Sequence, residues 1–256
     1  MSSDIRKQHT EYYLKQGIHP KEFHCPHQDF CRQFAYQGQM IETKMSLVGS
    51  LYGVRYPKIV VVSLDPPDQG DKFFLPERRT TEYIAKFTEA ENYTVNRPNP
   101  HWAMTQIIVN DILRHFGYTS KSGAAVVIES YSGRTIDNVT PYFAHVNVAK
   151  CSMRDPNKCQ AAREVHETCS NAYLVQELNI LQPEILVTQG KTTNDILGLL
   201  LIGKPVMVEN LPVTYQIKLA GKAVLWMPMR HPTQQLDKIR RDWPVYEVAI
   251  KEWAMK

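Results

Sequence analysis

Four short hydrophobic runs set the pattern of this chain. The run at residues 59–64 is mostly β-branched, which is typical of a strand buried on both faces of a sheet. It ends at Asp65, because the two prolines that follow cannot donate to a β-ladder and restrict the residue before them. Runs of similar character lie at residues 143–150, 184–190 and 223–228. The pattern therefore predicts four strands.

Segments with helical periodicity separate these runs. Within residues 102–116, Ile108, Ile112 and Phe116 recur at the spacing of one helix face, and Gly117 is a natural stop. The other predicted helices lie in residues 1–24, 157–182 and 193–201 and in a C-terminal segment with Tyr246, Ala249, Ile250 and Trp253 on one face. Residues 117–141 are predicted to be a loop, and residues 205–219 an irregular segment or a hairpin.

The alternation of strands and helices predicts an α/β fold. Helices between successive strands favour parallel pairing and a sheet covered on both faces. We expect a three-layer α/β/α sandwich with a central, mostly parallel four-stranded sheet. Residues 1–256 are expected to form a single domain, because the sequence contains neither a repeat nor a linker.

Composition and charge limit the function classes. The hydrophobic content of 43% and the charged content of 22% are typical of a globular protein. No run of eighteen apolar residues is present, so no membrane association is expected, and the polar N-terminus favours a cytoplasmic location. The excess of 30 basic over 26 acidic side chains permits nucleic-acid binding without requiring it. The sequence has no glycine-rich phosphate loop and no dinucleotide fingerprint, so no nucleotide cofactor is expected.

The cysteines suggest a metal centre. The chain has five of them, Cys25, Cys31, Cys151, Cys159 and Cys169. The odd number and the expected cytoplasmic location disfavour a disulfide framework. Two groups with short internal spacing, far apart in sequence, suit a zinc ion or an iron–sulphur cluster. His24 and His27 are also candidate ligands, although packing or surface roles are commoner for histidine.

Four polar or turn-forming groups follow predicted strands. They are Asp65, Asn147, the turn at Gly190 and His231. Because ligands of open α/β sheets bind at the carboxyl ends of the strands, we expect these groups to converge on one site. The alternative for Asp65 is a structural role in capping a turn.

Several short motifs resemble the uracil-DNA glycosylase superfamily, particularly its iron–sulphur branch. The resemblance covers roughly residues 25–235 and rests on residues 63–67 (SLDPP), residues 147–151 (NVAKC), Cys169, the strand and glycine at 184–190, and residues 231–233 (HPT). It implies a monofunctional DNA glycosylase that flips a nucleotide out of the duplex and hydrolyses its N-glycosidic bond.

The resemblance also implies roles for individual residues. Asp65 would orient or deprotonate the water and stabilise the cationic sugar, Asn147 would recognise the pyrimidine edge, and His231 would hydrogen-bond the base oxygen that gains charge. Phe73 would stack on the base, although core packing is the alternative. Arg230, or the residues that follow Thr233, would contact a phosphate or wedge the duplex.

A [4Fe–4S] cluster with a structural role is the cofactor that the resemblance implies, and zinc is the alternative. Its ligands would be Cys25, Cys31, Cys151 and Cys169. The chain departs from the branch here, because five residues separate Cys25 from Cys31 where the branch usually has two. Cys159 is an additional candidate ligand.

Two departures in the first motif bear on the substrate. Leu64 stands where the branch has a glutamate, and Pro67 stands where classical enzymes have a tyrosine that excludes bulk at carbon 5 of the base. We therefore expect a pocket that accepts a C5-modified cytosine, such as a hypermodified base of phage DNA, and a role in anti-phage defence. The alternatives are uracil excision in repair, a non-catalytic DNA-binding relative, and an unrelated α/β enzyme with a zinc site. The chain is expected to act as a monomer.

Overall fold

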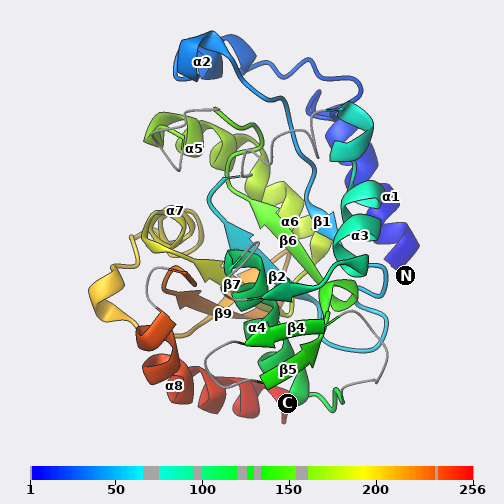
Figure 1. The fold of residues 1–256 in the computed structure, drawn as a ribbon. Coiled ribbons are helices and arrows are strands. Elements are labelled where there is room, and N and C mark those ends of the chain that lie inside the picture. The colour runs from blue at the N-terminus through cyan, green and yellow to red at the C-terminus, as the bar shows by residue number, and fades with distance from the viewer. Residues whose placement is uncertain are drawn as a thin grey trace.

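A six-stranded sheet forms the centre of the molecule (Figure 1). In this computed structural model the described residues are 2–65, 75–94, 100–119, 126–129, 134–153, 161–233 and 236–255. The strand order is β1-β6-β2-β7-β9-β8. The inner strands are β2 (Ile59–Ser63), β6 (Phe143–Asn147), β7 (Ile185–Gln189) and β9 (Lys222–Met229), and they run parallel. The edge strands β1 (Leu47–Val48) and β8 (Tyr215–Leu219) are antiparallel to their neighbours.

The α/β fold and the four parallel strands are confirmed, but the expected total of four strands is wrong. Strand β1 has only two residues, which is too short for a periodic pattern to identify. Strand β8 lies in the segment 205–219 and forms a hairpin with β9, which agrees with the hairpin alternative predicted for that segment. Both added strands close the edges of the sheet with antiparallel pairing.

A second, three-stranded sheet corrects the prediction for residues 117–141. It consists of β3 (Tyr93–Thr94), β4 (Val126–Glu129) and β5 (Arg134–Asp137). Strands β4 and β5 are antiparallel partners, with Val126 opposite Asp137. These strands have four residues or fewer, so their sequence could not be distinguished from a loop.

The predicted helices are confirmed where the structure describes them. They are α1 (Ser2–Lys15), α4 (Pro100–Arg114), α7 (Lys191–Ile202) and α8 (Leu236–Ala254). The predicted helix at 157–182 appears as α5 (Arg163–Cys169), a π-helical turn and α6 (Val175–Leu181), and its first four residues lie outside the described ranges. Two short helices were not predicted, α2 (Gln28–Arg32) and α3 (Thr81–Ala90).

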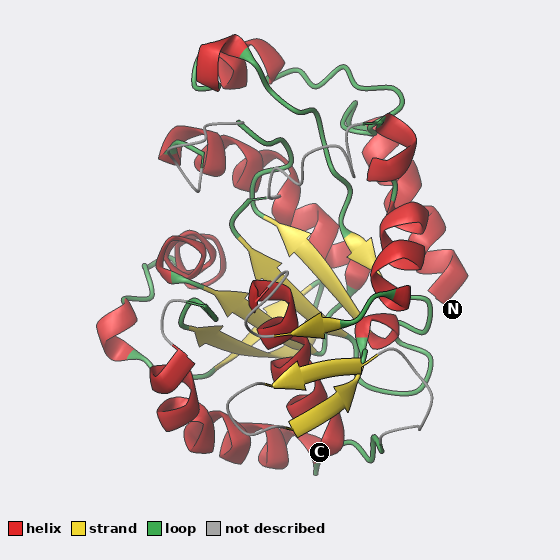
Figure 2. Ribbon diagram, viewed as in Figure 1, coloured by secondary structure: helices red, strands yellow, loops and turns green. Residues whose placement is uncertain are grey.

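Alternating side chains divide the core into two clusters, one on each face of the sheet. Ile59 and Val61 belong to a cluster with residues of α3, α4 and α8. Val60 and Val62 belong to a second cluster with residues of α6 and α7. Helices therefore contribute to the packing of both faces, as Figure 2 shows. No helix in the described ranges has the length and hydrophobicity that crossing a membrane requires.

Candidate active site

Polar side chains end the four parallel strands on one face of the sheet. Ser63, Asn147 and Gln189 are the last residues of β2, β6 and β7, and His231 follows β9 by two residues. Alternate residues of a strand lie on the same face, and each of these four residues lies on the face whose buried side chains pack against α4 and α8. The strands are in register here, with Ser63 opposite Asn147. The sheet therefore gathers these four side chains at its carboxyl edge, beside the N-terminal half of α4.

Gln189 links two other polar residues at this edge. Its Oε1 atom lies 3.2 Å from the hydroxyls of Ser63 and Thr105, and the single Thr105 proton is shared with the His101 carbonyl, at 3.0 Å. Because the single Ser63 proton points to Gln189, His145 must donate from Nε2 to the Ser63 oxygen, at 2.9 Å. The Nε2 atom of Gln189 is buried and has no hydrogen-bond partner among the residues that the structure describes. The amide thus keeps an unused donor.

Asn147 keeps an unused acceptor. Its side chain is buried, and its Oδ1 atom has no hydrogen-bond partner in the described part of the chain. Leaving a buried polar atom unsatisfied costs about 1–3 kcal/mol, so a ligand that satisfies such atoms gains this amount. An acceptor from Asn147 and a donor from Gln189 are the complement that the edge of a nucleobase offers.

The histidines of the site are held neutral. Burial lowers the pKa of His231, and its Nδ1 atom accepts from the Thr233 N–H at 3.4 Å, so the neutral ring carries its proton on Nε2. The His101 ring lies 5.3 Å from the His231 ring. Burial and the neighbouring His231 lower the pKa of His101 to about 4. Desolvation also holds the pKa of His145 well below its usual value.

The carboxylate of Asp65 points toward α5. Its Oδ1 atom lies 2.6 Å from His166 Nε2, and its Oδ2 atom accepts from the Ala161 N–H at 2.7 Å. Within the described residues, no hydrogen bond joins Asp65 to Asn147 or His231. The structure thus brings Asn147 and His231 to the same edge, and it places Asp65 two residues beyond Ser63 in contact with the thiol-bearing helix.

Arg230 lies inside the protein. Its Nε atom donates to Asp242 Oδ2 at 2.8 Å, and its NH2 group donates to the Leu211 carbonyl at 3.1 Å. The Nε and NH2 groups of the guanidinium are therefore already hydrogen-bonded to protein atoms and not to a phosphate. The predicted substrate contacts at Pro67 and Phe73 lie outside the described residues.

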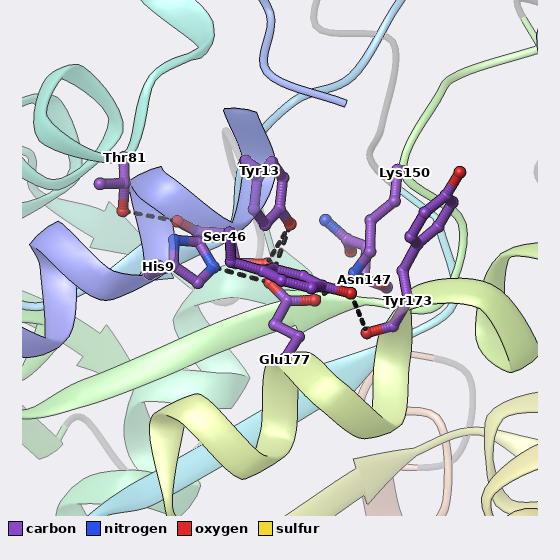
Figure 3. Close-up of polar contacts among 9 residues, drawn as sticks. His9, Tyr13, Ser46, Thr81, Asn147, Lys150, Tyr173 and Glu177 are labelled. Atoms are coloured by element: carbon purple, nitrogen blue, oxygen red, sulfur yellow. Dashed lines mark hydrogen bonds and ion pairs between the residues drawn. The ribbon is translucent and has the colours of Figure 1, made fainter. Parts of the chain in front are cut away.

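A buried polar network supports the loop that follows Asn147 (Figure 3). The Glu177 carboxylate accepts hydrogen bonds from His9, Tyr13, Ser46 and Lys150. Lys150 Nζ also donates to the Asn147 carbonyl at 2.7 Å. Burial acts to raise the pKa of Glu177, but the Lys150 ammonium and the His9 hydrogen bond hold it far below its usual range.

Four of the five cysteines come together from separate parts of the chain. Cys25, Cys31, Cys151 and Cys169 are free thiols, and all but Cys25 are buried. A hydrogen bond between Cys31 and Cys169 raises the pKa of Cys31 and lowers that of Cys169 to about 7. The Cys25 sulphur lies 3.2 Å from the Tyr173 hydroxyl, and the Cys151 sulphur 3.8 Å from that of Thr43.

The thiol cluster suits soft metals, because four sulphur ligands are the usual set for zinc or an iron–sulphur cluster. As placed in the structure, no group of three or more His, Cys, Asp or Glu side chains within the described ranges has a geometry that could hold a metal ion. Of the other candidates, His24 contacts the Glu22 carbonyl at 2.7 Å, the His27 ring lies 6.1 Å from that of Tyr173, and Cys159 lies outside the described residues.

Several residues of the site were not predicted from the sequence. Ser63 and Gln189 lie close to the predicted positions Asp65 and Gly190. Alternate residues of a strand lie on the same face, so the buried residues of each strand could have placed both side chains on the face of the site. His101, His145 and His166 gave no local signal, because their contacts depend on tertiary packing.

Comparisons with known proteins add no relative. No protein-family model matches the sequence, and no curated protein matches it.

Proposed function

We propose that this protein is a monofunctional DNA glycosylase that flips out a pyrimidine nucleotide and hydrolyses its N-glycosidic bond, leaving an abasic site. The observation that supports this proposal is the pair of unused amide atoms, Asn147 Oδ1 and Gln189 Nε2, at an edge that also carries His231. An extruded base supplies hydrogen-bond partners for both atoms.

The reaction breaks the bond between the sugar C1′ and the base nitrogen. The bonding electrons leave with the base, so negative charge gathers on the base and positive charge on the sugar. The neutral His231 ring, with its proton on Nε2, donates to the base oxygen that gains charge. The Asp65 carboxylate stabilises the sugar cation and orients the water, which adds to C1′ and passes its proton to that carboxylate.

The favoured substrate is a C5-modified cytosine of phage DNA, such as a glucosylated hydroxymethylcytosine, and the biological role is anti-phage defence. Pro67 supports this assignment, because it is smaller than the aromatic residue that excludes C5 substituents in similar enzymes. Uracil excision in repair is the alternative substrate choice. The proposal includes DNA as the partner, a monomeric cytoplasmic protein, no nucleotide cofactor, and a three-layer α/β/α arrangement.

Cys25, Cys31, Cys151 and Cys169 would hold a [4Fe–4S] cluster, with zinc as the alternative. The four free thiols fit such a group in number and chemistry. When bound, it supplies metal–thiolate bonds that tie the N-terminal segment to α5.

Base release from DNA tests the proposal. The purified protein is incubated with DNA that contains uracil, unmodified cytosine or C5-modified cytosines, and free bases are identified by mass. We expect release of a C5-modified cytosine, and an Asp65→Asn variant should be slower by about 10²–10⁴-fold. Asp237→Asn, at an exposed position in α8, is the matched control.

The outcomes separate the alternatives. Release of uracil alone would reject the modified-base substrate but keep the glycosylase. DNA binding without release of any base would reject the enzymatic proposal in favour of a DNA-binding role.

A further inference from the structure

Helix α5 contacts both Asp65 and the thiol cluster. His166 and Cys169 lie on this helix, three residues apart and therefore on adjacent turns of one face. Val165 of the same helix packs with Cys31 and Cys151 in a small hydrophobic cluster. The orientation of α5 is thus determined on the side of the cysteines.

Two donors fix the Asp65 carboxylate, one for each oxygen. His166 Nε2 lies 2.6 Å from Oδ1, and the Ala161 N–H donates to Oδ2 at 2.7 Å. The His166 side chain is 1% exposed and that of Asp65 is 11% exposed. Short bonds to an ionised carboxylate in such a shielded place are stronger than bonds between neutral groups.

The Nδ1 atom of His166 is buried and has no hydrogen-bond partner within the described ranges. Among those residues, the contact with Asp65 is the hydrogen bond that this ring makes. Burial of an imidazole with one unsatisfied nitrogen lowers the stability of the fold, so packing alone does not explain a histidine at this position. Such exceptions are expected where a group supports a functional residue.

We propose that His166 is a positioning residue for Asp65, which couples the orientation of the carboxylate to the thiol-bearing helix. The proposal rests on the proposed function, in which Asp65 acts on the sugar and the water. His166 does not touch the reacting atoms. It holds the carboxylate so that the orientation persists through the reaction, and a loss of this support lowers the rate of the chemical step more than substrate binding.

The first experiment compares His166→Leu with His166→Gln in the complete protein. Leucine removes the donor, whereas the glutamine amide can place an N–H group near the position of Nε2. We expect His166→Leu to lower kcat by about 10–100-fold with KM within about 2-fold, and His166→Gln to restore part of the loss. His115→Leu removes a histidine that contacts Glu247 at 3.6 Å and is the matched control. Visible absorption and thermal melting establish that each variant is folded. An unchanged kcat in folded His166→Leu would overturn the proposal.

The second experiment does not depend on activity. A double-mutant cycle combines His166→Leu with Asp65→Asn and measures the urea midpoint of unfolding for the four proteins. Contacting residues give non-additive shifts, which we expect here. An additive cycle overturns the assignment of His166 whether or not the protein is active. Absence of base release by the wild-type protein overturns the proposed function instead, so the two failures are distinguishable.

Discussion

Lys150 and Glu177 form an ion pair that is almost completely shielded from solvent, with side-chain exposures of 2% and 0%. Glu177 belongs to α6, and Lys150 lies in the loop that follows β6. The same ammonium donates to the Asn147 carbonyl at 2.7 Å. The pair therefore fixes the short loop between Asn147, a candidate base-recognition residue at the end of β6, and Cys151, a candidate ligand.

Glu177→Gln should destabilise the protein strongly. The substitution removes the charge that compensates Lys150, and an uncompensated buried charge typically costs about 3–5 kcal/mol. Urea unfolding followed by circular dichroism measures this loss. Glu247→Gln, which removes the partner of Lys251 on the surface of α8, should change the midpoint little. Equal, small effects of the two substitutions would contradict the structural role of Glu177.

Stability should fall as the pH drops below about 7, because His101 is held neutral. The pKa of His101 is about 4 in the folded protein, against 6.5 for the ordinary side chain. Between these values the unfolded chain binds the proton more readily, so acid favours unfolding. We expect this residue to contribute a loss of about 2 kcal/mol between roughly pH 7 and pH 5.

Urea unfolding of the wild type and of His101→Asn at several pH values measures this contribution. The variant should lose less stability on acidification, whereas His145 and His231 should still contribute in the same direction. An unchanged pH dependence in His101→Asn would contradict the assigned pKa.

The sequence predicted the elements that have a strong period and missed those that do not. Residues 59–64 read as a buried strand, and β2 lies at the centre of the sheet. By contrast, β1 and the strands β3 to β5 are too short for periodicity, and their formation depends on partners that are distant in sequence. The number of strands was wrong for this reason.

The residues of the candidate site also fall into those that the sequence predicted and those that it did not. The positions of Asn147 and His231 follow from where the strands end, which the sequence predicted. The contact between Asp65 and His166 joins residues 101 positions apart, and no local pattern predicts it. The sequence did not predict Gln189 as a site residue. The turn was assigned to Gly190, and the hydrogen-bond partners of Gln189 lie on β2 and α4, which are distant in sequence.

Substitution of any one of the four clustered cysteines should abolish binding of the proposed metal centre. We expect the purified protein to be brown with broad visible absorption, and Cys169→Ala to lose that absorption together with bound iron. His24→Ala should keep both, because its ring contacts a backbone carbonyl. Iron and zinc analysis of the two variants measures the outcome. A colourless wild-type protein with stoichiometric zinc would replace the cluster with the alternative metal.

Gln189→Glu should weaken base release and also lower stability, because it buries a carboxylate in place of a neutral amide. The new carboxylate keeps an acceptor for Ser63 and Thr105 and replaces the unused Nε2 donor with an oxygen. Loss of this donor should lower kcat/KM by about 10–100-fold on the best substrate, which corresponds to the 1–3 kcal/mol of one buried polar contact. Gln176→Glu, at an exposed position of α6, is the matched control. An unchanged kcat/KM in Gln189→Glu would place the base elsewhere.

Arg230→Met separates a structural role from a phosphate contact. The pairing of Arg230 with Asp242 at 2.8 Å inside the protein predicts that the substitution costs about 3–5 kcal/mol in unfolding free energy, because Asp242 loses its buried partner and keeps the exposed Arg241, at 3.5 Å. Asp242→Asn, which keeps the guanidinium, should cost a similar amount.

DNA affinity measured at several salt concentrations should keep its salt dependence in folded Arg230→Met. A phosphate contact would instead reduce the slope of log affinity against log salt by about 0.9. That result, with little change in stability, would support the substrate role predicted from the sequence, and Lys238→Met provides the comparison with an exposed cation nearby.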